Sequence, residues 1–199
     1  MSRISSNTIK QKKAKRISID NTTIFLEEGI DVDNRVIHLF EDIDQGVVSK
    51  VIRGIQLMTV KNAELPISIY INSFGGDVYS GFGLFDFIQS LQVEVHIYVV
   101  GCAMSAASII LMAGDHRYMY ENSKLMLHSA SGGVDGKSFE VVNDAEEHKR
   151  IHQQMSEIYA SRSNVDAKKW SKDLKYENLY YRAEEAMELG LIDSIVIRK

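Results

Sequence analysis

A short turn, Gly101–Ala107, joins two apolar runs and constrains this chain more than any other feature. The first run, 93–100, reads VEVHIYVV, and its alternating β-branched residues predict a strand. The second run, 109–113, is followed by Gly114, which predicts a short buried helix. Ser105 therefore lies at a helix start, where free backbone N–H groups favour negative charge. A helix cap is the simplest role for such a serine.

The composition predicts a single globular domain. The chain has 199 residues, 45% of them hydrophobic and 25% charged, which is enough for one sizeable core. No apolar run approaches the roughly 20 residues that span a bilayer, so we expect no membrane association. The lone cysteine, Cys102, excludes an internal disulfide framework and fits small buried packing in a reducing compartment. We therefore expect a cytoplasmic protein.

The first residues differ from the rest in charge. Residues 1–16 contain six basic residues and no acidic one. We interpret 1–22 as a basic, flexible segment and expect one domain over 23–199. Basic and aromatic residues do not alternate as on a nucleic-acid-binding surface, so no nucleic-acid partner is expected.

Strand and helix patterns alternate along the rest of the chain, which predicts an α/β fold with a largely parallel sheet. The patterns predict strands over 35–40, 67–72, 93–100, 117–120, 124–128 and 193–197. They predict helices over 44–61, 78–91, 105–113, 138–161, 166–173 and 183–189. The helix over 138–161 is long, charged and sparsely apolar, so we expect it to project or to lie at the surface.

Two other features fit a nucleophilic Ser105. His128 ends a predicted strand just before a Ser- and Gly-rich turn; alone it would be a structural histidine. Beside a serine at a sharp turn, however, it supplies the base that a hydroxyl nucleophile needs. Gly75 and Gly76 directly follow another predicted strand. They form either a plain turn or a loop that an acyl group can approach closely, and in the second case their backbone N–H groups bind an oxyanion.

The other histidines do not predict a metal site. His148 and His152 are four residues apart on one predicted helix and offer two ligands. A third ligand is not evident near them, and their helix is heavily charged. We expect both histidines to be solvated, and we expect neither a metal ion nor a cofactor in this chain.

Four motifs, taken together, resemble the family of Clp protease proteolytic subunits (ClpP). They are INSFGG at 71–76, GCAMSAAS at 101–108, MLHSASGG at 126–133 and AEEAMELGLIDSI at 183–195. Their order and spacing are similar to that family from about residue 35 to 197. The resemblance implies an α/β fold of the ClpP/crotonase type. This fold has repeated β-β-α units and a protruding handle helix, here about 134–162.

The same resemblance implies an activity and its partners. The family is a serine endopeptidase that assembles as a homo-oligomer of two stacked rings, which we expect to be heptameric. An AAA+ unfoldase of the Clp type docks on the ends and feeds in protein or peptide substrates. ATP is then used by that unfoldase and not by this chain.

By position, the resemblance assigns the nucleophile to Ser105 and the general base to His128. It assigns the oxyanion hole to Gly76 and to the backbone N–H of Ala106. Two segments match the edges that pair with an extended substrate as an added strand. Their residues are Gly75, Asp77, Val78, Ser129, Ala130 and Ser131.

The third member of the triad has three candidates. Counting back from Ala183 places the family's aspartate at Asn178, whereas counting forward from Asp173 without a gap places it at Glu177. We favour Asn178, because 179–181 then align with the bulky residues that follow the aspartate. An asparagine can hold the histidine tautomer but cannot stabilise an imidazolium by charge. Asp173 itself is the third candidate, and a charge on a solvated helix is its simpler explanation.

Several departures from the family pattern indicate a divergent branch, such as phage-type or accessory members. Phe74 stands where the family usually has proline, and Ala130 lacks the proline common after the histidine. The segment between Ser105 and His128 is also shorter than in typical bacterial members.

Three alternatives to a peptidase that uses Ser105 and His128 follow from the same residues. Asn178 favours a catalytically weak or inactive structural ring subunit. A crotonase-type acyl-CoA enzyme shares the fold and the oxyanion hole, but it needs neither Ser105 nor His128. A serine–lysine peptidase requires a lysine near the nucleophile. The nearest in sequence, Lys124, lies at the far end of the strand that ends at His128.

Overall fold

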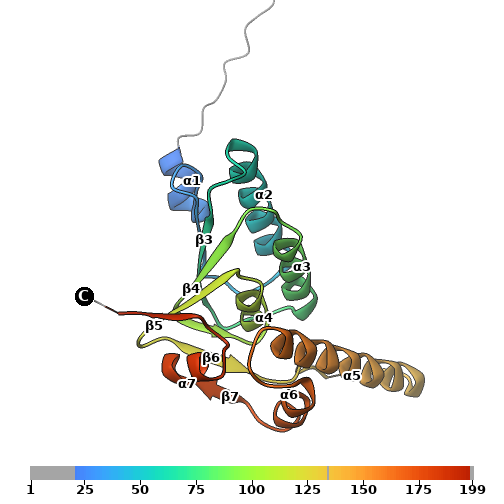
Figure 1. Ribbon diagram of the computed structural model, residues 1–199. Helices are drawn as coiled ribbons and strands as arrows, with labels where there is room; N and C mark the ends of the chain where they lie inside the picture. The colour runs from blue at the N-terminus through green and yellow to red at the C-terminus, as the bar shows by residue number, and fades with distance from the viewer. Residues whose placement is uncertain (1–20, 134, 198–199) are drawn as a thin grey trace, which may run out of the picture.

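The computed structural model describes residues 21–133 and 135–197 (Figure 1), so the basic segment expected over 1–22 lies almost wholly outside the described residues. The strands are β1 Ile30–Asp31, β2 Val36–Leu39, β3 Ile67–Ser73, β4 Val95–Met104, β5 His116–Tyr120, β6 Lys124–Leu127, β7 Leu179–Tyr181 and β8 Ser194–Val196. The helices are α1 Asn21–Glu28, α2 Gln45–Lys61, α3 Val78–Gln89, α4 Ala106–Met112, α5 Ser138–Ser161, α6 Ala167–Asp173 and α7 Ala183–Glu188. None of these helices combines the length and the apolar character that crossing a bilayer requires.

Within the described residues, the strands form one eight-stranded sheet with the main order β1-β2-β3-β4-β5-β8. Strands β2 to β5 and β8 run parallel to their neighbours, and β1 pairs antiparallel with β2. Strand β6 runs parallel to β4 and carries β7 as an antiparallel neighbour. The predicted α/β class with a largely parallel sheet is confirmed.

Strand β4 has two partners on one side. Its first half, His96–Val99, pairs with β5, and its last residues, Cys102–Met104, pair with β6. The prediction that this strand ends at Val100 is wrong, because β6 supplies a ladder that extends it to Met104. The change of partner falls at Gly101, whose φ of 91° lies in the region that favours glycine.

The core lies between the sheet and helices α2, α3 and α4. Alternate residues of β3, namely Ile67, Ile69 and Ile71, are fully buried, as the two-residue period of a strand requires. Helix α2 starts where predicted, because the Asp44 side chain accepts a hydrogen bond of 2.7 Å from the Val47 N–H. The strand-helix-strand crossovers thus bury one face of the sheet.

Half-buried aromatic rings cross the other face of the sheet in a row. His38, Tyr70, Tyr98 and Tyr118 are successive register partners on β2 to β5. The Tyr70 and Tyr98 rings stack at 4.8 Å between centroids, and the Tyr98 and Tyr118 rings at 4.6 Å. Offset stacking of neighbouring rings stabilises cross-strand pairs. The row marks the face that α2 to α4 leave uncovered.

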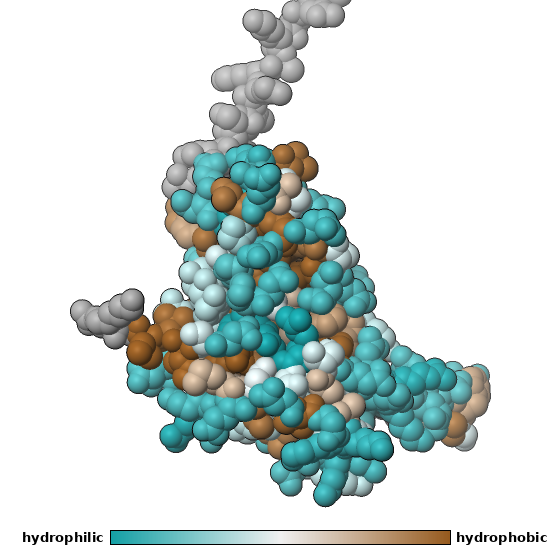
Figure 2. Space-filling model, in the orientation of Figure 1, coloured by the Kyte–Doolittle hydropathy of each residue, from teal (hydrophilic) through white to brown (hydrophobic). Residues whose placement is uncertain are grey.

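Helix α5 projects away from the body of the molecule (Figure 1). It has the predicted bounds, 138–161, and its C-terminal half is anchored by buried Ile151, Met155 and Tyr159. Its outer end carries exposed Phe139 and Val142, and Figure 2 shows apolar atoms at the tip of this projection. These apolar side chains are therefore available for contact with another molecule.

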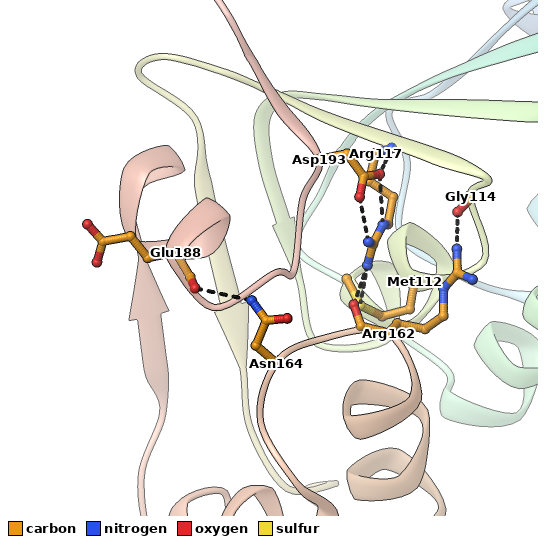
Figure 3. Close-up of polar contacts among 7 residues, drawn as sticks. All are labelled: Met112, Gly114, Arg117, Arg162, Asn164, Glu188 and Asp193. Atoms are coloured by element: carbon orange, nitrogen blue, oxygen red, sulfur yellow. Dashed lines mark hydrogen bonds and ion pairs between the residues drawn. The ribbon is translucent and has the colours of Figure 1, made fainter.

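The buried side chain of Arg117 connects separate segments of the chain beside α4 by hydrogen bonds (Figure 3). The Arg117 guanidinium donates to Asp193 Oδ1 at 2.7 Å and to the Arg162 carbonyl at 2.6 Å. The Arg117 N–H donates to Asp193 Oδ2 at 2.7 Å, and Arg162 donates to the Gly114 carbonyl. Burial raises the pKa of Asp193, but the hydrogen bonds and charge of Arg117 outweigh it and hold that pKa below its usual value.

We expect Asp193→Ala to lower the free energy of unfolding by about 2 kcal/mol, because it leaves the buried Arg117 without its carboxylate. Chemical denaturation followed by circular dichroism measures this change. Glu146→Ala is the control, because it removes an exposed ion pair with Lys149 and is expected to leave the denaturation midpoint unchanged. Equal effects of the two substitutions would contradict a structural role for the Arg117 pair.

Candidate active site

Ser105 joins β4 to α4 in a strained backbone conformation. Its φ of 52° and ψ of −126° lie where residues with a side chain are rarely found. Hydrogen bonds hold this conformation from both sides. The Ser105 N–H donates to the Met126 carbonyl of β6 at 3.0 Å. The Ser105 carbonyl accepts from the N–H and the hydroxyl of Ser108 at 2.9 and 2.6 Å.

The side chain of Ser105 does not cap helix α4. Ser105 occupies the N-cap position, but its hydroxyl makes no capping hydrogen bond. Instead, its Oγ lies 2.7 Å from Nε2 of His128. The simple helix-cap prediction is therefore wrong for the side chain. The sharp turn aims the hydroxyl at the histidine, and this is the arrangement that activates a serine.

His128 lies one residue beyond β6, whose ladder with β4 brings it to the sharp turn. Its imidazole is half-buried, and burial lowers its pKa below the ordinary value. A lowered pKa keeps the imidazole neutral around neutral pH. Neutral Nε2 can accept the Ser105 proton, which is what a general base must do.

The glycine loop after β3 lies directly against this turn. A Cβ on Gly75 would lie 2.7 Å from the Ser105 Cβ and 3.0 Å from the Ala106 nitrogen, so only glycine fits. Gly75 and Gly76 have φ values of 103° and 148°, and Gly76 bridges to Ile43. The Ala106 N–H belongs to the first turn of α4 and has no acceptor within that helix. Two backbone segments with N–H groups thus converge beside Ser105.

The ladder between β6 and β7 ends one residue short of both His128 and Asn178. The strands are antiparallel and pair Leu127 with Leu179, so one further step of the same register would set Asn178 opposite His128. The Asn178 side chain is exposed, and no hydrogen bond joins it to His128 in the described part of the chain. Backbone position favours Asn178, but its side chain is not engaged.

The other two candidates for the third triad position also lack contact with the histidine. The carboxylate of Asp173 forms an ion pair of 2.5 Å with Lys169, one turn earlier on α6. The Glu177 side chain is exposed. Among the residues that the structure describes, His128 therefore has Ser105 as its side-chain partner and no carboxylate.

The segments expected to pair with substrate border a small cavity. This cavity of about 180 Å³ lies between Val78, Ala130 and Ser131 on one side and the acidic face of α5 on the other. Tyr79 crosses it and donates from its hydroxyl to Glu147 at 3.1 Å. The structure thus brings residues of both predicted edges to the lining of one small cavity.

Two of the predicted substrate residues have structural partners as well. The Asp77 carboxylate caps α3 by accepting from the Ser80 N–H at 2.7 Å. The Ser129 hydroxyl lies 3.1 Å from Nδ1 of His152, whose Nε2 lies 2.9 Å from the Ser171 carbonyl. The prediction that His152 is solvated is therefore wrong, because both of its ring nitrogens have protein partners.

The comparison with known families decides the assignment. The family model described as Clp protease matches residues 19–199. The chain belongs to the Clp protease family. It is 34% identical over 164 residues to an ATP-dependent Clp protease proteolytic subunit from Mesostigma viride, covering 81% of this chain and 71% of that relative. The resemblance seen in the four motifs is confirmed, and the mixed α/β architecture is consistent with the ClpP fold.

In this Clp protease family member, a pair of buried hydroxyls supports the backbone of Ser105. The Ser108 hydroxyl, which donates to the Ser105 carbonyl, also lies 2.8 Å from the Tyr159 hydroxyl of α5. Tyr159 is fully buried, and burial raises its pKa, so it remains neutral. Sequence reasoning missed this link because Ser108 and Tyr159 are 51 residues apart.

We expect Gly75→Ala to reduce peptidase activity at least tenfold, because the new methyl group would displace the turn that carries Ser105. Gly83→Ala is the matched control. Gly83 is an exposed helical glycine whose Cβ would meet nothing within 4 Å. This substitution is expected to keep activity and to raise stability by about 0.5–1 kcal/mol. Peptide hydrolysis and thermal denaturation measure the two effects. Full activity in Gly75→Ala would contradict the close packing of the glycine loop.

Proposed function

We propose that this chain is a serine endopeptidase subunit that acts through an acyl-enzyme on Ser105, with His128 as general base. The observation that carries the proposal is the 2.7 Å contact between Ser105 Oγ and His128 Nε2 at a strained strand-to-helix turn. Membership of the Clp protease family supports a peptidase of the ClpP type.

The catalytic cycle follows from these positions. His128 Nε2 accepts the Ser105 proton as Oγ attacks the scissile carbonyl carbon, and the resulting oxyanion accepts hydrogen bonds from the Gly76 and Ala106 N–H groups. The imidazolium then gives its proton to the leaving amine. A water molecule, deprotonated by His128, attacks the acyl-enzyme and releases the acid product, which restores the Ser105 hydroxyl.

For the third position we propose Asn178, because one further step of the β6–β7 register would set it opposite His128. Its side-chain oxygen would accept the Nδ1–H and hold the tautomer in which Nε2 is the base. Glu177 and Asp173 are the alternatives, and Asp173 would first have to leave its ion pair with Lys169. A neutral Asn178 predicts slower chemistry than a carboxylate, because the imidazolium gains no charge partner.

The same proposal includes assembly and partners. Clp proteases in general form ring oligomers that work with a Clp unfoldase, and we propose two stacked heptameric rings fed by an AAA+ unfoldase. Exposed Phe139 and Val142 at the tip of α5 support a role for this helix as the handle between rings. Substrates would be unfolded proteins or peptides that pair along Gly75–Val78 and Ser129–Ser131. ATP would be consumed by the unfoldase.

The second candidate function is a catalytically weak or inactive structural ring subunit. The observation that favours it is the lack of a carboxylate on His128 within the described residues. The serine–lysine alternative is disfavoured, since His128 occupies the position that a lysine base would need. A crotonase-type acyl-CoA enzyme would not use the Ser105–His128 contact, so this contact disfavours that alternative.

Reaction with a fluorophosphonate probe tests the proposed nucleophile. We expect one covalent adduct per chain in the intact mass, mapped to Ser105 by peptide sequencing, and none in Ser105→Ala. Ser49→Ala, which removes an exposed serine of α2, is the control and should label like the unmodified chain. No label on the assembled protein would overturn the peptidase proposal and favour the structural subunit.

The pH dependence of peptide hydrolysis tests the state of His128. Because burial lowers its pKa below 6.5, the protonated, inactive form appears only at lower pH. We therefore expect kcat/KM to rise with pH through a midpoint below 6.5 and then to level off. Asp173→Asn should leave this midpoint unchanged. A midpoint above 6.5 that falls in Asp173→Asn would instead show that Asp173 pairs with the imidazole.

A further inference from the structure

A second group of chemically active side chains lies at the opposite end of β4 from Ser105. It consists of Glu94, His96 and His116, at the beginnings of β4 and β5. Nine residues separate His96 from Ser105, which is about 30 Å along an extended strand. The group lies beside the row of aromatic rings on the face that α2 to α4 leave uncovered, so it is not part of the proposed active site.

The sheet itself brings these three side chains together. His96 and His116 are direct register partners on the parallel strands β4 and β5. Their rings meet edge to face, with centroids 4.8 Å apart and an interplanar angle of 85°. Glu94 is two residues before His96 and therefore points to the same face. One carboxylate oxygen of Glu94 lies 3.3 Å from His96 Nε2.

The three donor atoms have the spacing and the chemistry of a metal site. All of them lie within 4.8 Å of one another. Donors around a tetrahedral Zn²⁺ at about 2.0–2.1 Å are roughly 3.3 Å apart, which is the separation that His96 and Glu94 already have. Glu94 and His116 are exposed, so rotation of their side chains can close the remaining distance. Two imidazoles and one carboxylate suit zinc rather than Mg²⁺, which prefers oxygen ligands.

We propose that Glu94, His96 and His116 bind one Zn²⁺ ion, with water as the fourth ligand. The ion would join the start of β4 to the start of β5 across the ladder between them. Binding to the folded chain alone would also stabilise the fold, by an amount that rises with the logarithm of the free zinc concentration once this exceeds the dissociation constant.

This proposal replaces the expectation of a metal-free chain. The sequence pattern drew attention to His148 and His152, because a spacing of four residues is easily seen on a helix. Of these, His152 is engaged with Ser129 and Ser171. The pair His96 and His116 is separated by 20 residues and becomes adjacent only through the register of two parallel strands.

Isothermal titration of the full chain with ZnCl₂, after dialysis against a chelator, tests the site. We expect one Zn²⁺ per chain. His96→Ala and His116→Ala should each weaken binding at least a hundredfold, and Glu94→Gln about tenfold. His148→Ala is the matched control, a histidine outside the cluster, and should bind zinc like the unmodified chain. MgCl₂ should give no saturable binding.

A second measurement distinguishes the loss of zinc binding from the failure of a variant to fold. Added Zn²⁺ should raise the thermal denaturation midpoint of the unmodified chain and of His148→Ala, but not that of His116→Ala, whose substitution is at an exposed position. Co²⁺ in place of zinc should give the visible absorption of a four-coordinate site in the same two proteins. Zinc binding that survives loss of both His96 and His116, or the absence of saturable binding, overturns the proposal.

Discussion

The backbone of Ser105 has a conformation that residues with a side chain rarely adopt. Strain of this kind is of order 1–3 kcal/mol, and each compensating hydrogen bond contributes about 1 kcal/mol. The compensation comes from β6 through Met126, from α4 through Ser108 and, behind it, from α5 through Tyr159. The direction of one hydroxyl therefore depends on three elements that are distant in sequence. Local sequence at the turn is necessary for this geometry but not sufficient.

The electrostatics of the site follow from what surrounds His128. Burial without a charged partner favours the neutral imidazole. The histidine can therefore accept a proton, but no neighbouring charge among the described residues stabilises the imidazolium that results. The carboxylate candidate on α6, Asp173, forms an ion pair with Lys169. In the proposed mechanism, stabilisation of the transition state would therefore rest mainly on backbone N–H groups.

Local patterns predicted most of the elements, but α1 and β1 were not predicted. Long-range pairing accounts for the differences at β4 and β7. The bounds of α2 and α5 follow from a capping residue and from helical periodicity, both of which are visible in the sequence. The extension of β4 to Met104 depends on β6, and β7 has three residues, too few for a recognisable alternation. Motif spacing singled out Ser105 and His128. The Ser108–Tyr159 contact and the pairing of His96 with His116 required the folded chain.

Strand β4 changes partner at Gly101, from β5 to β6. Its first half belongs to the broad sheet and contributes Tyr98 to the aromatic row, whereas its last residues belong to the smaller ladder with β6 that leads to Ser105. One strand thus connects two parts of the sheet that have different neighbours. The outer surface near its start and the turn at its end therefore depend on separate contacts.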